Sequence, residues 1–185
     1  MKNKGLIVGL FSLLALVQII VPLSMISNKE SIIRDGFEFK FKTAPIDPYD
    51  AFRGRYVWLS IKENDVAVPC GFNLKRGQTV YAFIEVGEDG FAKFSSITEE
   101  KPYGLPYIKT KASYVFKGKA RLELPFERYY MEEGSAPKAE KIYRQHSNRD
   151  KQDAYLTVKI KDGQTAITGL YVAGERIEDA VKKIE

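Results

Sequence analysis

Hydrophobic and polar positions divide the chain into two parts. Residues 5–28 contain no charged side chain, and most positions from residue 6 to residue 26 are Leu, Ile, Val, Phe or Ala. At a rise of roughly 1.5 Å per residue, about 20 such residues cross a hydrocarbon layer of roughly 30 Å. The pattern predicts a transmembrane anchor with a short cytoplasmic N-terminus over residues 1–28, followed by a short linker over residues 29–36.

Basic residues ahead of the apolar run set the expected orientation. Lys2 and Lys4 favour a cytoplasmic N-terminus, because lysines and arginines accumulate on that side of transmembrane helices. The chain would then be a single-pass protein of the bacterial inner membrane, with its C-terminal domain periplasmic or extracellular. A cleaved signal peptide is the alternative interpretation. The long apolar run and the poor cleavage sequence Met25-Ile26-Ser27 favour an uncleaved anchor.

Beyond residue 36 the hydrophobic period changes to two, which is typical of β-strands. Phenylalanine and charged residues alternate over residues 37–42, as in a strand with one buried face. The sequence therefore predicts a mainly β domain over residues 37–185. The expected strands cover residues 37–42, 56–61, 79–86, 91–97, 154–161 and 164–172.

Turn sequences separate pairs of these strands. Gly87-Glu88-Asp89-Gly90 follows the strand at 79–86, and Asp162-Gly163 follows the strand at 154–161. Both are expected to close hairpins, because Asp and Gly tolerate the positive φ that tight turns need. A further tight turn is expected at Ala173-Gly174.

Helix is scarce in the predicted domain. Ser135-Ala136-Pro137 resembles a helix start, since Ser is a favoured cap and Pro suits the first turn. A short helix is therefore expected over residues 138–145. Residues 178–185 are expected to form a terminal helical turn.

Recurring aromatic residues suggest that the domain contains two similar β-units, covering residues 37–102 and 114–178. Such units would pack as a sandwich or as two small barrels. Chance echoes in a protein rich in Tyr and Phe are the alternative. The matching pairs, each 74 positions apart by subtraction, are Phe52 with Phe126, Tyr56 with Tyr130 and Tyr81 with Tyr155.

Charge and cysteine content exclude several classes of function. The formal net charge is +5, and the basic residues are too scattered to indicate a nucleic-acid partner. The single cysteine, Cys70, precludes an intramolecular disulfide and is expected to be a small core residue. The sequence has no zinc-ligand spacing, phosphate loop or dinucleotide fingerprint. We therefore expect no metal and no cofactor.

The densest cluster of potential functional residues lies between residues 47 and 59. Asp47 precedes a proline, which restricts it to extended or turn geometry, and Gly54 suits a backbone shape that a Cβ would oppose. The segment resembles the GDYXXLXY family of membrane-anchored envelope proteins, whose pattern follows an N-terminal hydrophobic helix. The matching residues are Asp47, Pro48, Asp50, Gly54, Tyr56 and Leu59.

The chain also departs from that pattern. Arg55 stands where the family name has Asp, and Ile61 stands where it has the last Tyr. If the missing Asp were catalytic or metal-binding, this chain would lack the activity. A second stretch resembles the family's glutamate-arginine-tyrosine segment. It contains Glu127, Arg128, Tyr130 and Glu132, with Ala139 and Glu140 following. The family has no established activity, and the resemblance implies association with multi-pass envelope membrane proteins.

The acids of these two segments allow two interpretations. Asp47, Asp50, Glu127 and Glu132 could serve as general acid and base, or as ligands of a divalent cation. Alternatively, the Asp side chains bond backbone N–H groups of a turn, with Arg53 and Arg128 as counter-charges. Nearby cations oppose metal binding, which favours the structural interpretation.

The aromatic segment at residues 101–107 is of a different kind. Its two prolines and glycine preclude regular sheet, while Tyr103 and Tyr107 offer amphipathic contact area. Together with Trp58, these tyrosines would suit a cell-wall sugar. A loop that covers the edge of the core is the alternative.

The leading hypothesis is a non-enzymatic accessory module that docks on a membrane partner, with the anchor raising its local concentration. An envelope hydrolase that uses the paired carboxylates, and a sugar-binding module, are the competing hypotheses.

Overall fold

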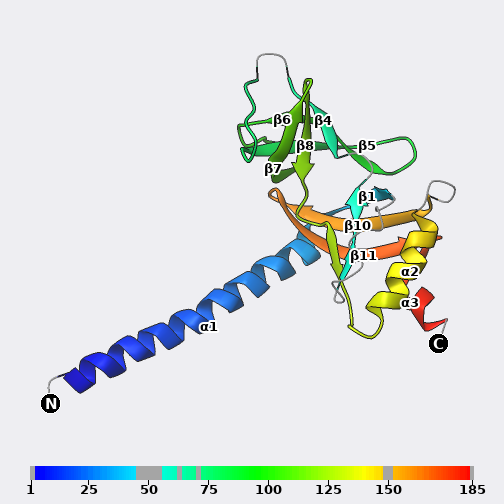
Figure 1. Cartoon of the computed structure of the whole chain (residues 1–185). Coiled ribbons are helices and arrows are strands. Elements are labelled where there is room, and N and C mark those ends of the chain that lie inside the picture. The colour runs from blue at the N-terminus through cyan, green and yellow to red at the C-terminus, as the bar shows by residue number, and fades with distance from the viewer. Residues whose placement is uncertain (1–2, 45–55, 62–63, 70–71, 148–151, 184–185) are drawn as a thin grey trace.

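The computed structural model describes residues 3–44, 56–61, 64–69, 72–147 and 152–183. Its first element, α1 (Asn3–Asp35), projects away from a β-rich body (Figure 1). The apolar part of α1 has a mean hydropathy of 2.6, and none of it is buried against the rest of the protein. Within the described residues it is the one helix long and apolar enough to cross a membrane.

The helix does not stop where its apolar run ends. It continues through residues 29–35, so the expected linker at 29–36 consists of the last helical turns. Gly36 ends the helix, and its N–H still donates to the Ile32 carbonyl at 2.9 Å. Ile32 is buried against the domain, because this end of the helix packs on the strands rather than standing free.

The sheet nearest α1 contains strands from both ends of the chain. All of its pairings are antiparallel, and the order is β12-β11-β10-β1-β3. β1 starts directly after α1 and pairs with β10, Phe37 lying opposite Ile160. The strands are β1 (Phe37–Ala44), β3 (Ser60–Ile61), β10 (Ala154–Lys161), β11 (Gln164–Val172) and β12 (Glu175–Arg176).

The second sheet has the order β4-β8-β7-β5-β6 and lies above the first in Figure 1. Its two edge strands, β4 and β6, contact one another, so the sheet curls nearly into a barrel. Its strands are β4 (Asp65–Ala67), β5 (Thr79–Val86), β6 (Ala92–Thr98), β7 (Tyr107–Phe116) and β8 (Lys119–Glu123). A separate two-stranded ribbon joins β2 (Tyr56–Trp58) to β9 (Arg128–Tyr130).

Two short helices complete the domain at the end opposite α1 (Figure 1). α2 (Ala136–His146) begins close to the predicted position, with Pro137 in its first turn. Ser135 caps it without a side-chain hydrogen bond. Its buried face, spaced at three and four residues, consists of Ala136, Ala139, Ile142 and Tyr143. The terminal helix, α3 (Ile177–Lys182), contacts α2.

One core unites the sheets. The ring of Phe41 in β1 lies 5.4 Å from that of Phe94 in β6 and 5.2 Å from that of Phe126, which precedes β9. Phe41 is fully buried, as the alternation of β1 predicts for an inward position, and Phe126 is fully buried as well. The predicted mainly β architecture behind an N-terminal apolar helix is confirmed.

The body does contain two larger β-assemblies, but they do not follow the sequence units 37–102 and 114–178. The first sheet combines β1 and β3 with β10, β11 and β12, and the second combines β4, β5 and β6 with β7 and β8. Each proposed unit therefore contributes strands to both sheets. The physical reason is the pairing of β1 with β10, which ties the two ends of the domain together.

Candidate functional site

The two segments that carry the sequence motifs meet in the β2–β9 ribbon. Tyr56 lies opposite Tyr130, and the flanking pairs are Val57 with Tyr129 and Trp58 with Arg128. The ribbon continues past β2, where the N–H of Leu59 donates to the carbonyl of Glu127 at 2.7 Å. The motif residues Asp47, Asp50, Arg53 and Gly54, together with Arg55, lie outside the described residues.

The inner side of the ribbon belongs to the core. Val57, Leu59 and Phe126 are fully buried, and Tyr129 is nearly so. Leu59, a motif residue, therefore has a packing role that its apolar side chain explains. Only the side chains at the outer positions of the ribbon can therefore contact a ligand or a partner.

On the outer side, Arg128 and Glu132 are exposed and Tyr130 is 66% exposed. The strand alternation of β9 separates them from the buried Tyr129. Glu127 is half-buried, and this burial raises the pKa of its carboxyl group, although a hydrogen bond from the Leu124 N–H opposes the shift. Glu127 and Glu132 lie at opposite ends of β9, so the structure does not join them as an acid pair.

A buried tyrosine connects α2 to the first sheet. The Tyr143 hydroxyl is hydrogen-bonded to the side chains of Thr43 and Ser147 and to the backbone of Ser60. Burial raises its pKa to about 12. This network fixes α2 against β1 and β3 of the first sheet, and α2 also contacts β2, the strand that carries the first motif. The sequence signal for Tyr143 was its place on the apolar stripe of α2.

A second tyrosine ties the ribbon to the C-terminal helix. The Tyr129 hydroxyl donates to the Glu178 carboxylate, which also pairs with Arg176 at 3.4 Å. Burial, followed by the hydrogen bond to Glu178, raises the pKa of Tyr129 to about 12. The motif segment is thus bonded to the last elements of the chain.

The profile of a known protein family covers this ribbon. The profile of the family described as GDYXXLXY protein matches residues 18–170, which include the end of α1, the ribbon and β10. The chain belongs to the GDYXXLXY family. No curated protein and no solved structure matches it significantly.

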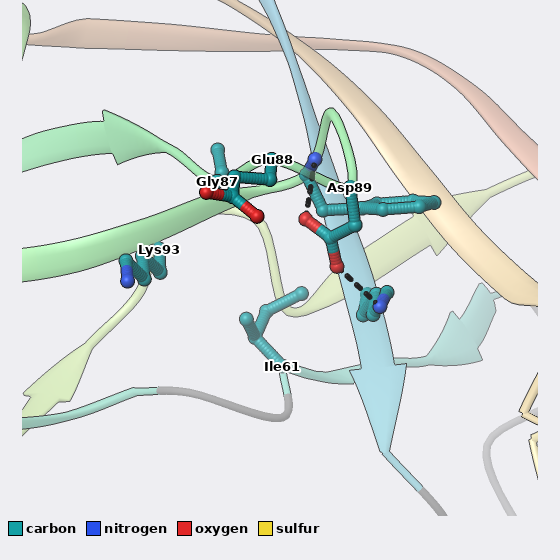
Figure 2. Close-up of a pocket in the computed structure, with 8 residues that line it drawn as sticks. Ile61, Gly87, Glu88, Asp89 and Lys93 are labelled. Atoms are coloured by element: carbon teal, nitrogen blue, oxygen red, sulfur yellow. Dashed lines mark hydrogen bonds and ion pairs between the residues drawn. The ribbon is translucent and has the colours of Figure 1, made fainter.

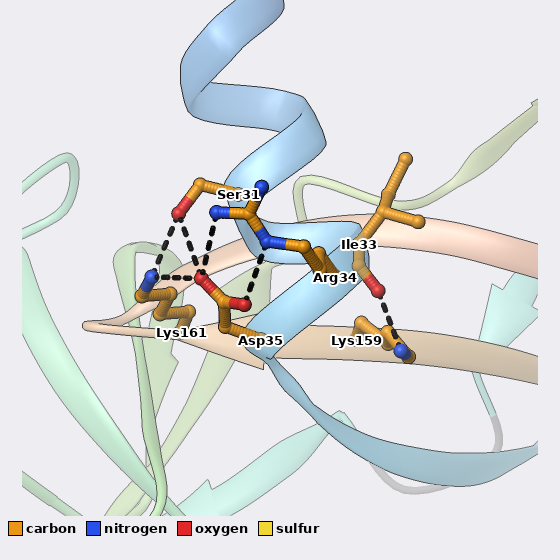
Figure 3. Close-up of polar contacts among 6 residues, drawn as sticks. All are labelled: Ser31, Ile33, Arg34, Asp35, Lys159 and Lys161. Carbon is orange, nitrogen blue, oxygen red and sulfur yellow. Dashed lines mark hydrogen bonds and ion pairs between the residues drawn. The ribbon is translucent and has the colours of Figure 1, made fainter.

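In this family member, the junction between α1 and the domain is built from polar contacts on both sides of the helix. Lys161 bonds the Asp35 carboxylate at 2.9 Å and the Ser31 hydroxyl at 2.7 Å (Figure 3). On the opposite side of the helix, the Lys159 ammonium group donates to the Ile33 carbonyl (Figure 3). Arg34 completes the cluster by pairing with Asp35 at 2.9 Å.

Two further contacts bind the helix to the β10–β11 turn. The Asn28 amide donates to Gln164 at 2.7 Å, and the Lys29 ammonium group donates to the Thr165 carbonyl at 2.7 Å. The contacts therefore extend from Asn28 to Asp35, over the whole polar part of the helix. Sequence reasoning missed them because the partners lie more than 120 positions apart (161 − 35 = 126).

A pocket of about 700 Å³ lies beside this junction. Aromatic and proline side chains of the 101–107 loop form one wall, and Phe37, Phe39 and Ile160 form another. The predicted pair Tyr103 and Tyr107 both line it, whereas Trp58 lies in the ribbon. Tyr107 itself is buried and begins β7, so only the part of the segment before it is a loop.

A smaller pocket of about 340 Å³ lies at the β5–β6 turn. Its Asp89 carboxylate accepts hydrogen bonds from Lys42 at 2.6 Å and from the Phe91 N–H at 3.2 Å (Figure 2). These bonds lower the pKa of Asp89, so its ionised carboxylate stabilises the β5–β6 turn. The described residues contain no cluster of three or more His, Cys, Asp or Glu side chains able to hold a metal ion.

Proposed function

We propose that this chain is a membrane-anchored, non-enzymatic docking module of the bacterial envelope. Its domain would lie outside the cytoplasm and bind a multi-pass membrane protein. The observation that carries the proposal is the junction between α1 and the domain, because an anchor that only tethers needs no such contacts.

The junction makes the anchor an extension of the folded body. Residues 27–35 prolong the helix by roughly 13 Å beyond the apolar run, at about 1.5 Å per residue. Contacts at Asn28, Lys29 and Asp35 hold these turns on the β10–β11 hairpin. The domain would therefore stand at a fixed height and angle above the bilayer. Anchoring also raises its effective concentration at a partner in the same membrane.

The outer side of the β2–β9 ribbon is the surface best suited to contact that partner. Tyr130 and Arg128 are exposed there, and Tyr and Arg are enriched among residues that dominate binding energy at interfaces. The inner side of the same ribbon is fixed by Tyr129 and Leu59, so the exposed groups stand on a rigid base.

The test uses the full-length chain with a C-terminal tag, expressed in its native membrane and mildly crosslinked. The expected result is recovery of one multi-pass membrane protein in near-equal amount. Tyr130→Ala should reduce that recovery several-fold. Tyr114→Ala is the matched control, since Tyr114 is 56% exposed but lies on β7 in the other sheet. Recovery of the chain alone, or equal loss with both variants, would contradict the proposal.

A second measurement separates docking from catalysis. The purified chain should not turn over envelope glycans or lipid-linked precursors. If it did, and if Asp50→Ala abolished the turnover without lowering the melting temperature, the chain would be a hydrolase and the docking proposal would be wrong.

A further inference from the structure

Three exposed apolar side chains line the pocket of about 700 Å³ beside the junction with α1. Tyr103 is 89% exposed, Phe37 is 77% exposed and Leu105 is 61% exposed. All three line the same pocket, together with Asp35 at the end of α1. Such residues clustered around a hollow mark an interaction surface, because single scattered apolar residues need no partner but a contiguous group does.

Contacts place this surface at the end of the domain where the anchor enters. Gln164 and Thr165 in the β10–β11 hairpin bond Asn28 and Lys29. At the turn of the same hairpin, the Gly163 carbonyl accepts a hydrogen bond from the Lys109 N–H at 2.9 Å.

The first residues of β7 therefore lie directly on the hairpin. The ring of Tyr107 fills the space that a side chain at position 163 would occupy. The loop before Tyr107 thus lies next to the hairpin that holds the anchor.

The lengths agree with a position at the bilayer surface. A span ending at Ile26 places Asn28 roughly 3 Å and Asp35 roughly 13 Å beyond the hydrocarbon edge, at about 1.5 Å per residue. Each headgroup layer is roughly 5–8 Å thick. The loop, which shares a pocket with Asp35 and lies against the hairpin bonded to Asn28, is within side-chain reach of that layer.

We infer that the loop at residues 101–106 forms a second membrane contact, which rests on the anchoring in the proposed function. Tyr103 and Leu105 lie at the boundary between headgroups and acyl chains, and the Lys101 ammonium group faces lipid phosphates. Tyrosine suits this boundary because its ring is apolar and its hydroxyl is polar. Pro102 and Pro106 each fix their own φ, and Gly104 adopts a φ of +76°, which other residues disfavour.

The composition of the surface favours the bilayer over a small ligand. The charged residues that line the pocket are two acids, Asp35 and Asp162, and two lysines, Lys101 and Lys161, so their charges cancel. A surface without net charge does not attract an ionic ligand. Transfer of exposed Tyr and Leu side chains from water to the membrane interface is favourable. The apolar part of α1 enters the same bilayer, so the loop contact extends the anchor contact.

The test places a fluorescent reporter at the loop in the full-length chain. Three single variants are made in the parent chain, which retains Trp58: Tyr103→Trp, Tyr114→Trp and Leu16→Trp. Each variant is reconstituted in vesicles of phosphatidylcholine and phosphatidylglycerol. Lipids brominated on their acyl chains quench tryptophans that reach the acyl region. The signal is the quenched fraction of each variant beyond that of the parent.

The expected result is strong added quenching for Leu16→Trp, at the centre of the anchor, and clear added quenching with a blue-shifted emission for Tyr103→Trp. Tyr114→Trp should show none. Adding Leu105→Asp to the Tyr103→Trp chain should lower its quenching at least two-fold, because a carboxylate resists entry into the interface.

The outcomes separate the two proposals. Absence of quenching for Leu16→Trp would overturn the anchoring itself. Quenching for Leu16→Trp without quenching for Tyr103→Trp would overturn the loop contact alone. An emission shift of the Tyr103→Trp chain with soluble cell-wall glycans, and not with lipid, would overturn the inference and assign the surface to a sugar.

Discussion

The hydroxyl of Tyr129 in β9 donates a hydrogen bond to the carboxylate of Glu178 in α3, joining a family motif to the end of the chain. Because the folded-state pKa of Tyr129 is raised to about 12, its contribution to stability is complete below pH 10 and is lost as the pH rises through 12. Absorbance at 295 nm should therefore show Tyr129 ionising late, near pH 12. Tyr129→Phe should remove one tyrosine from that late phase and leave the rest of the titration unchanged.

Removing the hydroxyl of Tyr143 should destabilise the domain. Tyr143→Phe leaves the polar groups of Thr43, Ser60 and Ser147 without their shared partner, at a cost of about 1–3 kcal/mol. Thermal unfolding in detergent should show a melting temperature lowered by roughly 2–4 °C for each kcal/mol. Tyr114→Phe, at an exposed tyrosine, should leave the melting temperature unchanged. An equal shift in both variants would argue against the buried network.

A methyl group at Gly36 should disrupt the junction between α1 and the domain. The added Cβ would lie 2.4 Å from the Ile32 carbonyl oxygen and 3.1 Å from that of Ile160, and backbone atoms cannot move aside cheaply. Gly36→Ala should cost about 1–3 kcal/mol. It should also speed hydrogen exchange in the β10–β11 hairpin. Gly134→Ala, where nothing lies within 4 Å, is the control and should change neither measurement.

The packing of Tyr107 on Gly163 can be separated from backbone strain by a pair of variants. Gly163 and Gly118 have nearly equal φ, +76° and +75°, so an alanine at either position carries a similar strain. Only at Gly163 would the new Cβ meet a ring, 2.6 Å from Tyr107. Gly163→Ala should lower the free energy of unfolding by about 1–3 kcal/mol more than Gly118→Ala. Equal losses in chemical denaturation would show that the ring does not pack there.

Glu127 should make the stability of the domain depend on pH. Its folded-state pKa is raised by burial, so its favourable contribution is present below the ordinary pKa of 4.5 and is lost as the pH rises through the folded value. Glu127→Gln cannot ionise and should raise the melting temperature at pH 7 but not at pH 4. A variant that is less stable than the parent at pH 7 would mean that the carboxylate is a favourable partner there.

Local patterns in the sequence predicted most of the strands. The hairpin at Asp162-Gly163 connects β10 and β11 with the expected bounds, and the alternation at residues 37–42 marks β1. Both signals depend on neighbouring residues only, so no tertiary information was needed. Positive φ at Gly90, Asp162 and Ala173 agrees with the three predicted turns.

The long-range pairings could not be read in this way. Nothing near Phe37 identifies Ile160 as its partner, and the aromatic echoes instead suggested two consecutive units. The hairpin between β7 and β8 was also missed, because no strand was expected on either side of Lys117-Gly118. Lys117 adopts a φ of +48° there, which its residue type does not favour.

The candidate site was predicted in part. The two motif segments were found from their residues, but their pairing through Val57 and Tyr129 depends on the fold. The hydroxyl contacts of Tyr129 and Tyr143 were not predicted, because the pattern of apolar residues around a tyrosine does not identify its hydrogen-bond partner. Asp47 and Asp50 stay predictions, as they lie outside the described residues.

Because β1 pairs with β10, β1 must wait for its partner strand during synthesis. β1 ends at Ala44 and β10 begins at Ala154, so the ribosome adds 110 residues (154 − 44) before the partner strand starts to appear. At about 5–20 residues per second, that interval lasts roughly 5–20 s. Throughout it, a strand carrying Phe37, Phe39 and Phe41 is attached to an apolar helix and has an unpaired edge. A message truncated before residue 154 would leave that strand without its partner, so the truncated chain would expose a strand edge able to pair with other chains.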